Sequence, residues 1–161
     1  MRIGLVFAMG ILVGAGVTTT LAQSERLPGD NYVNHVAIAV PNFDEAFAFY
    51  TQKMGFREAF TVKDPQGKPT LAYMQANRNT FVEIQQANAN RPKGLNHYGL
   101  HVQDLKATVA ALKQRGVTVT EPNVRPDDSS VANATDPAGI RIEMFELGPG
   151  SPAGKAIASW K

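Results

Sequence analysis

The chain has 161 residues, of which 43% are hydrophobic and 19% are charged, and its formal net charge is +2. These values are typical of one compact domain or two small fused units, and they exclude an intrinsically disordered chain. The small net charge, with no basic stripe interleaved with aromatic residues, argues against nucleic-acid binding and favours a small-molecule partner.

Residues 1–22 have the pattern of a signal peptide. Met1-Arg2 is a positively charged start, residues 3–17 are uncharged and mostly apolar, and Thr20-Leu21-Ala22 places small residues where a signal peptidase cleaves. We expect cleavage before Gln23, export to a bacterial periplasm or the medium, and no stable membrane anchor afterwards. A retained anchor is the alternative, but the apolar run is shorter than the roughly 20 residues of a spanning helix. The chain has no Cys, so no disulfide or thiolate ligand is available.

After an N-terminal extension at residues 23–30, the periods of strand and helix alternate. Strict apolar alternation predicts a strand at 32–40. Asn42, with Glu45 three residues later, predicts the start of a helix that ends at Gly55. Further strands are expected at 56–63, 70–76 and 80–86, before a polar linker at 87–95.

The second half repeats this order. The expected elements are a strand at 96–103, a helix from Asp104 to Arg115, and strands at 117–120, 130–135 and 140–147. Each half is therefore predicted to be a βαβββ module, at about 31–86 and 96–147, in one α+β domain at 31–147. Residues 148–161 are expected to be a C-terminal tail.

The halves repeat ionisable residues as well as an apolar pattern. NHVAIAV at 34–40 returns as NHYGLHV at 96–102, and FVEI at 81–84 returns as RIEM at 141–144. Strand parity turns two histidines and two glutamates away from the helices, towards a cavity where two curved sheets converge. Two neutral imidazoles and two carboxylates there would be balanced by one divalent cation, whether Zn, Ni, Mn, Co or Fe. The predicted metal ligands are His35, Glu83, His97 and Glu143.

Three other polar residues share these faces. Tyr73 and Arg141 point towards the same cavity by parity, without a specific signal. His101 lies on the same face as His97 and is a candidate acid–base or supporting residue, with a packed or solvated histidine as the alternative.

Several motifs together resemble the vicinal oxygen chelate superfamily, which includes glyoxalase I, bleomycin-resistance proteins, methylmalonyl-CoA epimerase, fosfomycin-resistance enzymes and extradiol dioxygenases. The matching segments are His35-Val36-Ala37-Ile38, Phe49-Tyr50, Met54-Gly55-Phe56, and Asp136-Pro137-Ala138-Gly139-Ile140-Arg141-Ile142-Glu143. The resemblance implies two βαβββ modules that form a cup of curved sheet around a metal ion. It also places the four predicted ligands on the superfamily's ligand positions, with the set that glyoxalase I carries.

One departure bears on the substrate. Glyoxalase I has an Arg four residues after its first ligand and an Asn four residues after its second, and both contact glutathione. This chain has Ala39 and Ala87 at those positions, so we do not expect a glutathione adduct as substrate.

The predicted function is metal-dependent lyase or isomerase chemistry on a small substrate chelated through vicinal oxygens, with Glu143 or Glu83 as the base. The first alternative is an extradiol dioxygenase, in which His35, His97 and Glu143 hold Fe(II) and His101 takes part. The second is a non-catalytic protein that binds or sequesters a small molecule. The sequence leaves open whether the cup forms within one chain or across a homodimer.

Overall fold

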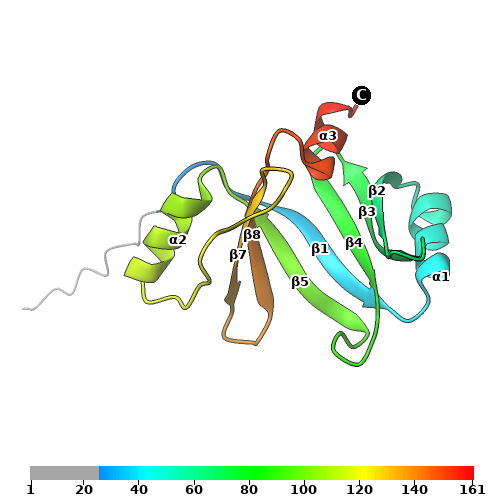
Figure 1. Cartoon of the computed structure of the whole chain (residues 1–161), viewed down its shortest axis with the longest axis horizontal. Helices are drawn as coiled ribbons and strands as arrows, with labels where there is room; N and C mark the ends of the chain where they lie inside the picture. The colour runs from blue at the N-terminus through cyan, green and yellow to red at the C-terminus, as the bar shows by residue number, and fades with distance from the viewer. Residues whose placement is uncertain (1–25) are drawn as a thin grey trace, which may run out of the picture.

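The two repeats join edge to edge into one curved sheet. In the computed structural model, which describes residues 26–161, eight strands lie in the order β2-β3-β4-β1-β5-β8-β7-β6 (Figure 1). The first module consists of β1 (Tyr32–Val40), α1 (Phe43–Ala48), β2 (Arg57–Lys63), β3 (Pro69–Asn77) and β4 (Thr80–Gln86). The second consists of β5 (Gly94–His101), α2 (Leu105–Gln114), β6 (Asn123–Val124), β7 (Ser130–Thr135) and β8 (Arg141–Glu146).

The strands that carry the repeated histidines are neighbours at the centre of the sheet. β1 pairs in parallel with β4, β5 pairs in parallel with β8, and β1 and β5 join the modules in antiparallel fashion. Each module's helix connects its first strand to the rest, as expected for βαβββ. The predicted α+β class is confirmed, and the two expected sheets are halves of one continuous sheet that is not closed into a barrel.

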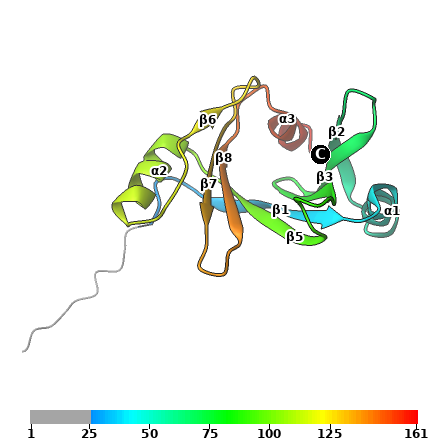
Figure 2. The same ribbon diagram turned by 60° about the horizontal axis from the view of Figure 1, so that its bottom comes forward.

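Two apolar cores lie between the sheet and the module helices. In the first module, Val40 and Ile84 pack with Phe43 of α1, and in the second, Met144 packs with Leu105 and Val109 of α2. The opposite face of the sheet is concave. Figure 2 shows α1 and α2 at opposite ends of the molecule. The helix α3 (Pro152–Ala158) lies between the two ends of the curved sheet, at β2–β3 and β6–β7. The cup is therefore lined by the strand faces that carry the repeated polar residues.

The predicted helix starts are confirmed by their caps. Asn42 Oδ1 accepts from the Glu45 amide at 3.2 Å, and Asp104 Oδ1 accepts from the Ala107 amide at 2.8 Å. The first helix continues beyond α1 as a π-helical turn at Phe49–Lys53. It ends before Gly55, whose φ of 71° lies in the left-handed region.

Two features differ from the sequence analysis. The strand predicted at 117–120 is wrong: that stretch contributes an isolated bridge from Val119 to Ala134, and the short β6 follows instead. Val117 and Val119 pack against the core under α2, and Pro122 cannot donate to a ladder. The expected tail contains α3, whose N-cap Ser151 Oγ accepts from the Gly154 amide at 3.1 Å. Ser followed by Pro at the first helical position was a readable start signal.

The predicted signal peptide lies outside the described residues. Within residues 26–161, no helix is long and apolar enough to span a membrane.

Candidate metal centre

Strand register brings the four predicted ligands together within one chain. Ala37 of β1 is the cross-strand partner of both Glu83 and His97. In the same way, Gly99 of β5 is the partner of both His35 and Glu143. Each small residue therefore lies between two ligand candidates, one from each neighbouring strand. This arrangement has the internal two-fold symmetry of the repeat.

The small residues leave room for the imidazoles. A Cβ atom built on Gly99 would lie 2.0 Å from His35 Cε1, far inside van der Waals contact. Ala37, its repeat counterpart, is fully buried. A residue with a larger side chain at position 99 would displace His35, so the glycine is part of the site.

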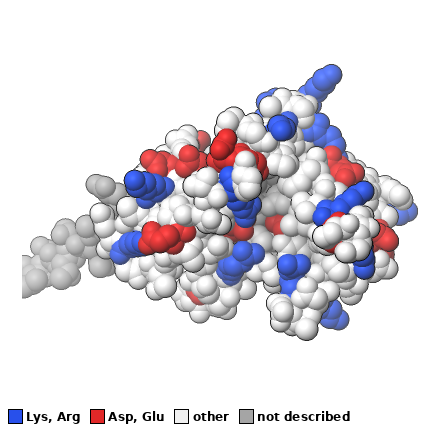
Figure 3. Space-filling model, viewed as in Figure 1, with Lys and Arg blue, Asp and Glu red and all other residues white. Residues whose placement is uncertain are grey.

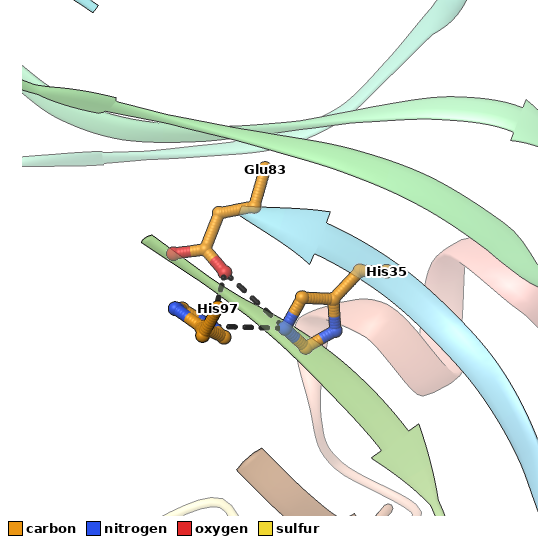
Figure 4. A group of neighbouring side chains, drawn as sticks. All are labelled: His35, Glu83 and His97. Carbon is orange, nitrogen blue, oxygen red and sulfur yellow. Dashed lines mark hydrogen bonds and ion pairs between the residues drawn. The ribbon is translucent and has the colours of Figure 1, made fainter. Parts of the chain in front are cut away.

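Three donor atoms form a compact triangle (Figure 4). His35 Nε2 lies 3.2 Å from His97 Nε2, and Glu83 Oε2 lies 3.4 Å and 3.5 Å from these two nitrogens. Donor atoms about 2.1 Å from one ion would be about 3.0 to 3.4 Å apart at octahedral to tetrahedral angles. The triangle therefore has the dimensions of a metal-ligand set.

Glu143 is set back from this triangle. Its Oε1 lies 3.9 Å from His35 Nε2. Its Oε2 lies 3.3 Å from Arg141 Nη1 and 3.9 Å from Arg125 Nη2. The Glu143 carboxylate thus bridges the donor triangle and two guanidinium groups.

The protonation states of the site suit a divalent cation. Burial lowers the pKa of His35 to about 4, partly offset by the charge of Glu83, so this imidazole is neutral at pH 7. Burial alone would raise the pKa of Glu83, but its hydrogen bond with His97 and the nearby imidazoles lower it below the usual value. Burial and the charges of Glu83 and Glu143 raise the pKa of Tyr73 well above its usual value, so the phenol stays protonated. The residues present therefore fit a bound metal ion.

An asparagine precedes each histidine and contacts its other ring nitrogen. Asn34 Oδ1 lies 3.3 Å from His35 Nδ1, and Asn96 Oδ1 lies 2.7 Å from His97 Nδ1. A proton on Nδ1, donated to the amide oxygen, leaves Nε2 free to bind a metal. Arg141 Nη2 also lies close to His97 Nδ1, but it cannot donate to a nitrogen that carries a proton. Its 3.1 Å hydrogen bond to Asn96 Oδ1 is compatible with a proton on His97 Nδ1. Sequence reasoning missed these asparagines, although the repeat contained them.

His101 does not line this cavity. Its ring stacks on Tyr32 with centroids 4.8 Å apart and meets Phe145 at 5.8 Å. Phe145 in turn contacts His35 at 5.3 Å between ring centroids, so this phenylalanine lies between His101 and the site. The structure therefore favours the packed alternative for His101, and its catalytic role stays a prediction.

The triangle lies at the floor of a cavity of about 310 Å³. As predicted from parity, Tyr73 and Arg141 line it. Residues that the sequence analysis did not assign to the site complete its walls: Phe60, Val62, Leu71, Gln85, Arg125, Asp127, Ser129, Val131, Phe145, Leu147, Ser151, Pro152 and Ala153. On the face in Figure 3, basic and acidic side chains are interspersed and do not form a single basic patch.

Comparisons with known proteins agree with this architecture. The family model of the Glyoxalase/Bleomycin resistance protein/Dioxygenase superfamily matches residues 32–144. A 2-epi-5-epi-valiolone epimerase from an Actinomyces species is 30% identical over 156 residues, covering 78% of this chain and 85% of that protein. An Arabidopsis thaliana protein named "Probable lactoylglutathione lyase, chloroplastic" is 30% identical over 125 residues, covering 71% of this chain and 35% of that protein.

A solved structure shows the same fold. The crystal structure of a methylmalonyl-CoA epimerase is 26% identical, with a TM-score of 0.59, and the match covers 71% of this chain and 94% of that chain. Together, the family model and the relatives confirm the resemblance read from the motifs. The chain belongs to the glyoxalase/bleomycin resistance protein/dioxygenase, or vicinal oxygen chelate, superfamily.

Proposed function

We propose that this protein is a divalent-metal-dependent enzyme that moves a proton on a small substrate held through two neighbouring oxygen atoms. The observation that carries the proposal is the buried triangle of His35 Nε2, His97 Nε2 and Glu83 Oε2 at the floor of a cavity. The names of the relatives, which are epimerases and a lyase, support this class of chemistry.

The residues divide into three roles. His35, His97 and Glu83 would hold the ion, which when bound supplies Lewis-acid polarisation of the substrate oxygens. Glu143, set back at 3.9 Å from His35 Nε2, would take the proton from carbon and return it. Tyr73, whose hydroxyl lies 3.5 Å from His35 Nε2, would donate a hydrogen bond where negative charge develops.

Glutathione is not proposed as part of the substrate. The positions at which glyoxalase I carries its glutathione contacts are Ala39 and Ala87 in this chain. The expected result with the glutathione hemithioacetal of methylglyoxal is little turnover. Turnover of about 1 to 1000 per second, the usual range for enzymes, would restore glutathione dependence.

A dioxygenase is the second candidate, because two histidines and one carboxylate are also the ligands of non-haem Fe(II) oxygenases. The carboxylate nearest to both imidazoles is Glu83, whereas the sequence analysis assigned Glu143 to this triad. Iron-dependent oxygen consumption with catechol, without proton exchange, would favour this candidate.

The test combines metal content with proton exchange. Elemental analysis of the purified protein should show about one divalent ion per chain, lost in His97→Ala but kept in His101→Ala, a matched variant outside the cavity. With the metal bound, lactaldehyde and glyceraldehyde in D₂O should gain deuterium beside the carbonyl, measured by NMR. Full metal occupancy in His97→Ala would overturn the metal assignment. A loaded protein that binds these probes but exchanges no proton would favour the non-catalytic binding alternative.

We also propose that the protein is exported after cleavage before Gln23, on the pattern of residues 1–22 alone. Intact-mass analysis of the protein from its own cells tests this. A mature chain starting near Gln23 in the envelope or medium supports export, and Met1 retained on a cytosolic protein would exclude it.

A further inference from the structure

Two arginines lie beside Glu143 in the cavity wall. Arg125 and Arg141 both line the cavity, from the loop before β7 and from β8. Their guanidinium groups lie on one side of Glu143, and the donor triangle lies on the other. The mechanism proposed above uses neither arginine.

The Glu143 carboxylate shows what fits between these groups. One of its oxygens lies 3.9 Å from His35 Nε2, and the other lies 3.3 Å from Arg141 and 3.9 Å from Arg125. A carboxylate of a substrate could take the same position, with one oxygen towards the metal ligands and the other towards the guanidinium groups. Arginine is well suited to this contact, since its planar donors match the two oxygens of a carboxylate.

The guanidinium group of Arg141 makes several hydrogen bonds, whereas the contact of Arg125 with Glu143 is long. Arg141 donates to Asn133 Oδ1 at 3.0 Å and to Asn96 Oδ1 at 3.1 Å in addition to its contact with Glu143. Arg125 is about half exposed at the rim, and its ion pair with Glu143 is long, at 3.9 Å. The loop that carries Arg125 is closed by a 2.8 Å bond from its amide to the Ser129 carbonyl, which fixes the backbone at the cavity mouth.

The charges around the cavity favour an anionic ligand. A divalent ion would balance the two carboxylates of Glu83 and Glu143. Among the remaining lining residues, the positive charges of Arg125 and Arg141 exceed the negative charge of Asp127 by one. A ligand with a single negative charge would therefore neutralise the site, in surroundings where unbalanced charge is costly.

We infer that Arg125 and Arg141 form an anion-binding subsite that selects a small carboxylic acid with a hydroxyl or carbonyl oxygen beside its carboxylate. The inference rests on the proposed function and adds the substrate class to it. The cavity volume of about 310 Å³, bounded at the rim by Ser151 and Pro152 of the α3 segment, limits the ligand to a small molecule. Entry of the substrate carboxylate displaces Glu143 from the arginines and leaves its carboxylate available as a proton acceptor.

The experiment compares two probes of similar size, one anionic and one neutral. Lactate and lactamide are nearly equal in size and each has a hydroxyl beside a carbonyl oxygen, but in lactamide an uncharged NH₂ group replaces the second carboxylate oxygen. Both are titrated by calorimetry into the Zn²⁺-loaded full protein, its Arg125→Gln variant and a Lys113→Gln control. Lys113, near the end of α2, forms an ion pair with Glu121 and does not line the cavity. The control therefore removes one positive charge from a site outside the cavity.

Lactate should bind the wild type at least about 10-fold more tightly than lactamide. Arg125→Gln should weaken lactate binding by about 10- to 100-fold, the usual worth of charge-assisted hydrogen bonds, and change lactamide binding less than about 2-fold. The Lys113→Gln control should match the wild type with both probes.

Two results would overturn the inference: equal binding of both probes by the wild type, or an unchanged lactate affinity in Arg125→Gln. These results differ from a failure of the proposed function, in which the wild type would not retain the metal or would bind it without proton exchange.

Discussion

Replacing Gly99 by Ala is the sharpest test of how the sheet shapes the site. The added methyl group would lie 2.0 Å from His35 Cε1, 2.3 Å from Nδ1 and 2.5 Å from Nε2. An ordinary van der Waals contact is more than an ångström longer than the shortest of these distances, so the imidazole must move. Overpacking of this kind costs about 1 to 3 kcal/mol, and we expect a loss of folding stability of that size. The same shift takes Nε2 out of the donor triangle, so metal affinity should also fall.

A double-mutant cycle isolates this contact. Urea unfolding of the metal-free protein, followed by circular dichroism, should show the loss in Gly99→Ala but little additional loss when His35→Ala is already present, because the clashing ring is gone. Gly150→Ala serves as the control, since a Cβ there meets one atom, Asp127 O, at an ordinary 3.6 Å. An equal cost of Gly99→Ala in both backgrounds would refute the reasoning, because the strain would then not involve His35.

Three further predictions concern the metal centre. Asn96→Leu should lower metal affinity by about 10- to 100-fold, measured by competition with a chelator, because His97 loses the acceptor for Nδ1–H. In the metal-free protein, the pKa of His35 is about 4 when folded and 6.5 when unfolded, so the unfolded chain binds the proton first and stability falls as pH drops from 6.5 to 4. His35 should account for about 3 kcal/mol of the loss in the free energy of unfolding between pH 6.5 and 4. The loss should therefore be smaller in His35→Asn, and an equal loss in both proteins would contradict the prediction. Glu83→Gln should slow proton exchange at least about 100-fold, whereas His101→Ala should have little effect; a mild effect of Glu83→Gln would contradict the role of Glu83 as a metal-holding residue.

Strand parity accounts for most of what the sequence predicted correctly. The strands at 32–40, 80–86 and 130–135 have the predicted bounds, because turn or loop residues flank each of them. Parity also predicted which face His35 and Glu83 would occupy, since successive side chains of a strand point to opposite faces of the sheet.

Long-range contacts decide the features that sequence reasoning missed. The stretch at 117–120 alternates like a strand, but packing under α2 holds Val117 and Val119, and no local pattern reveals that. Arg125 reaches the cavity because its loop closes at Ser129, and the role of Gly99 follows from its register opposite His35. The contacts between Gly99 and His35 and between the Arg125 loop and the site join parts of the chain that are far apart in sequence, whereas propensity and period describe neighbours.

The two repeats differ immediately beside the donor triangle. Gln85 follows Glu83 by two residues, whereas the corresponding residue after Glu143 is Phe145, and both line the cavity. The repeated ligands present similar donors to either side of a bound molecule, so they distinguish poorly between mirror images. The amide of Gln85 and the aromatic ring of Phe145 make the two sides of the cavity chemically different. The two enantiomers of a chiral ligand would therefore place different groups against the amide and against the ring. The handedness that the site can recognise therefore comes from the positions where the duplicated halves have diverged.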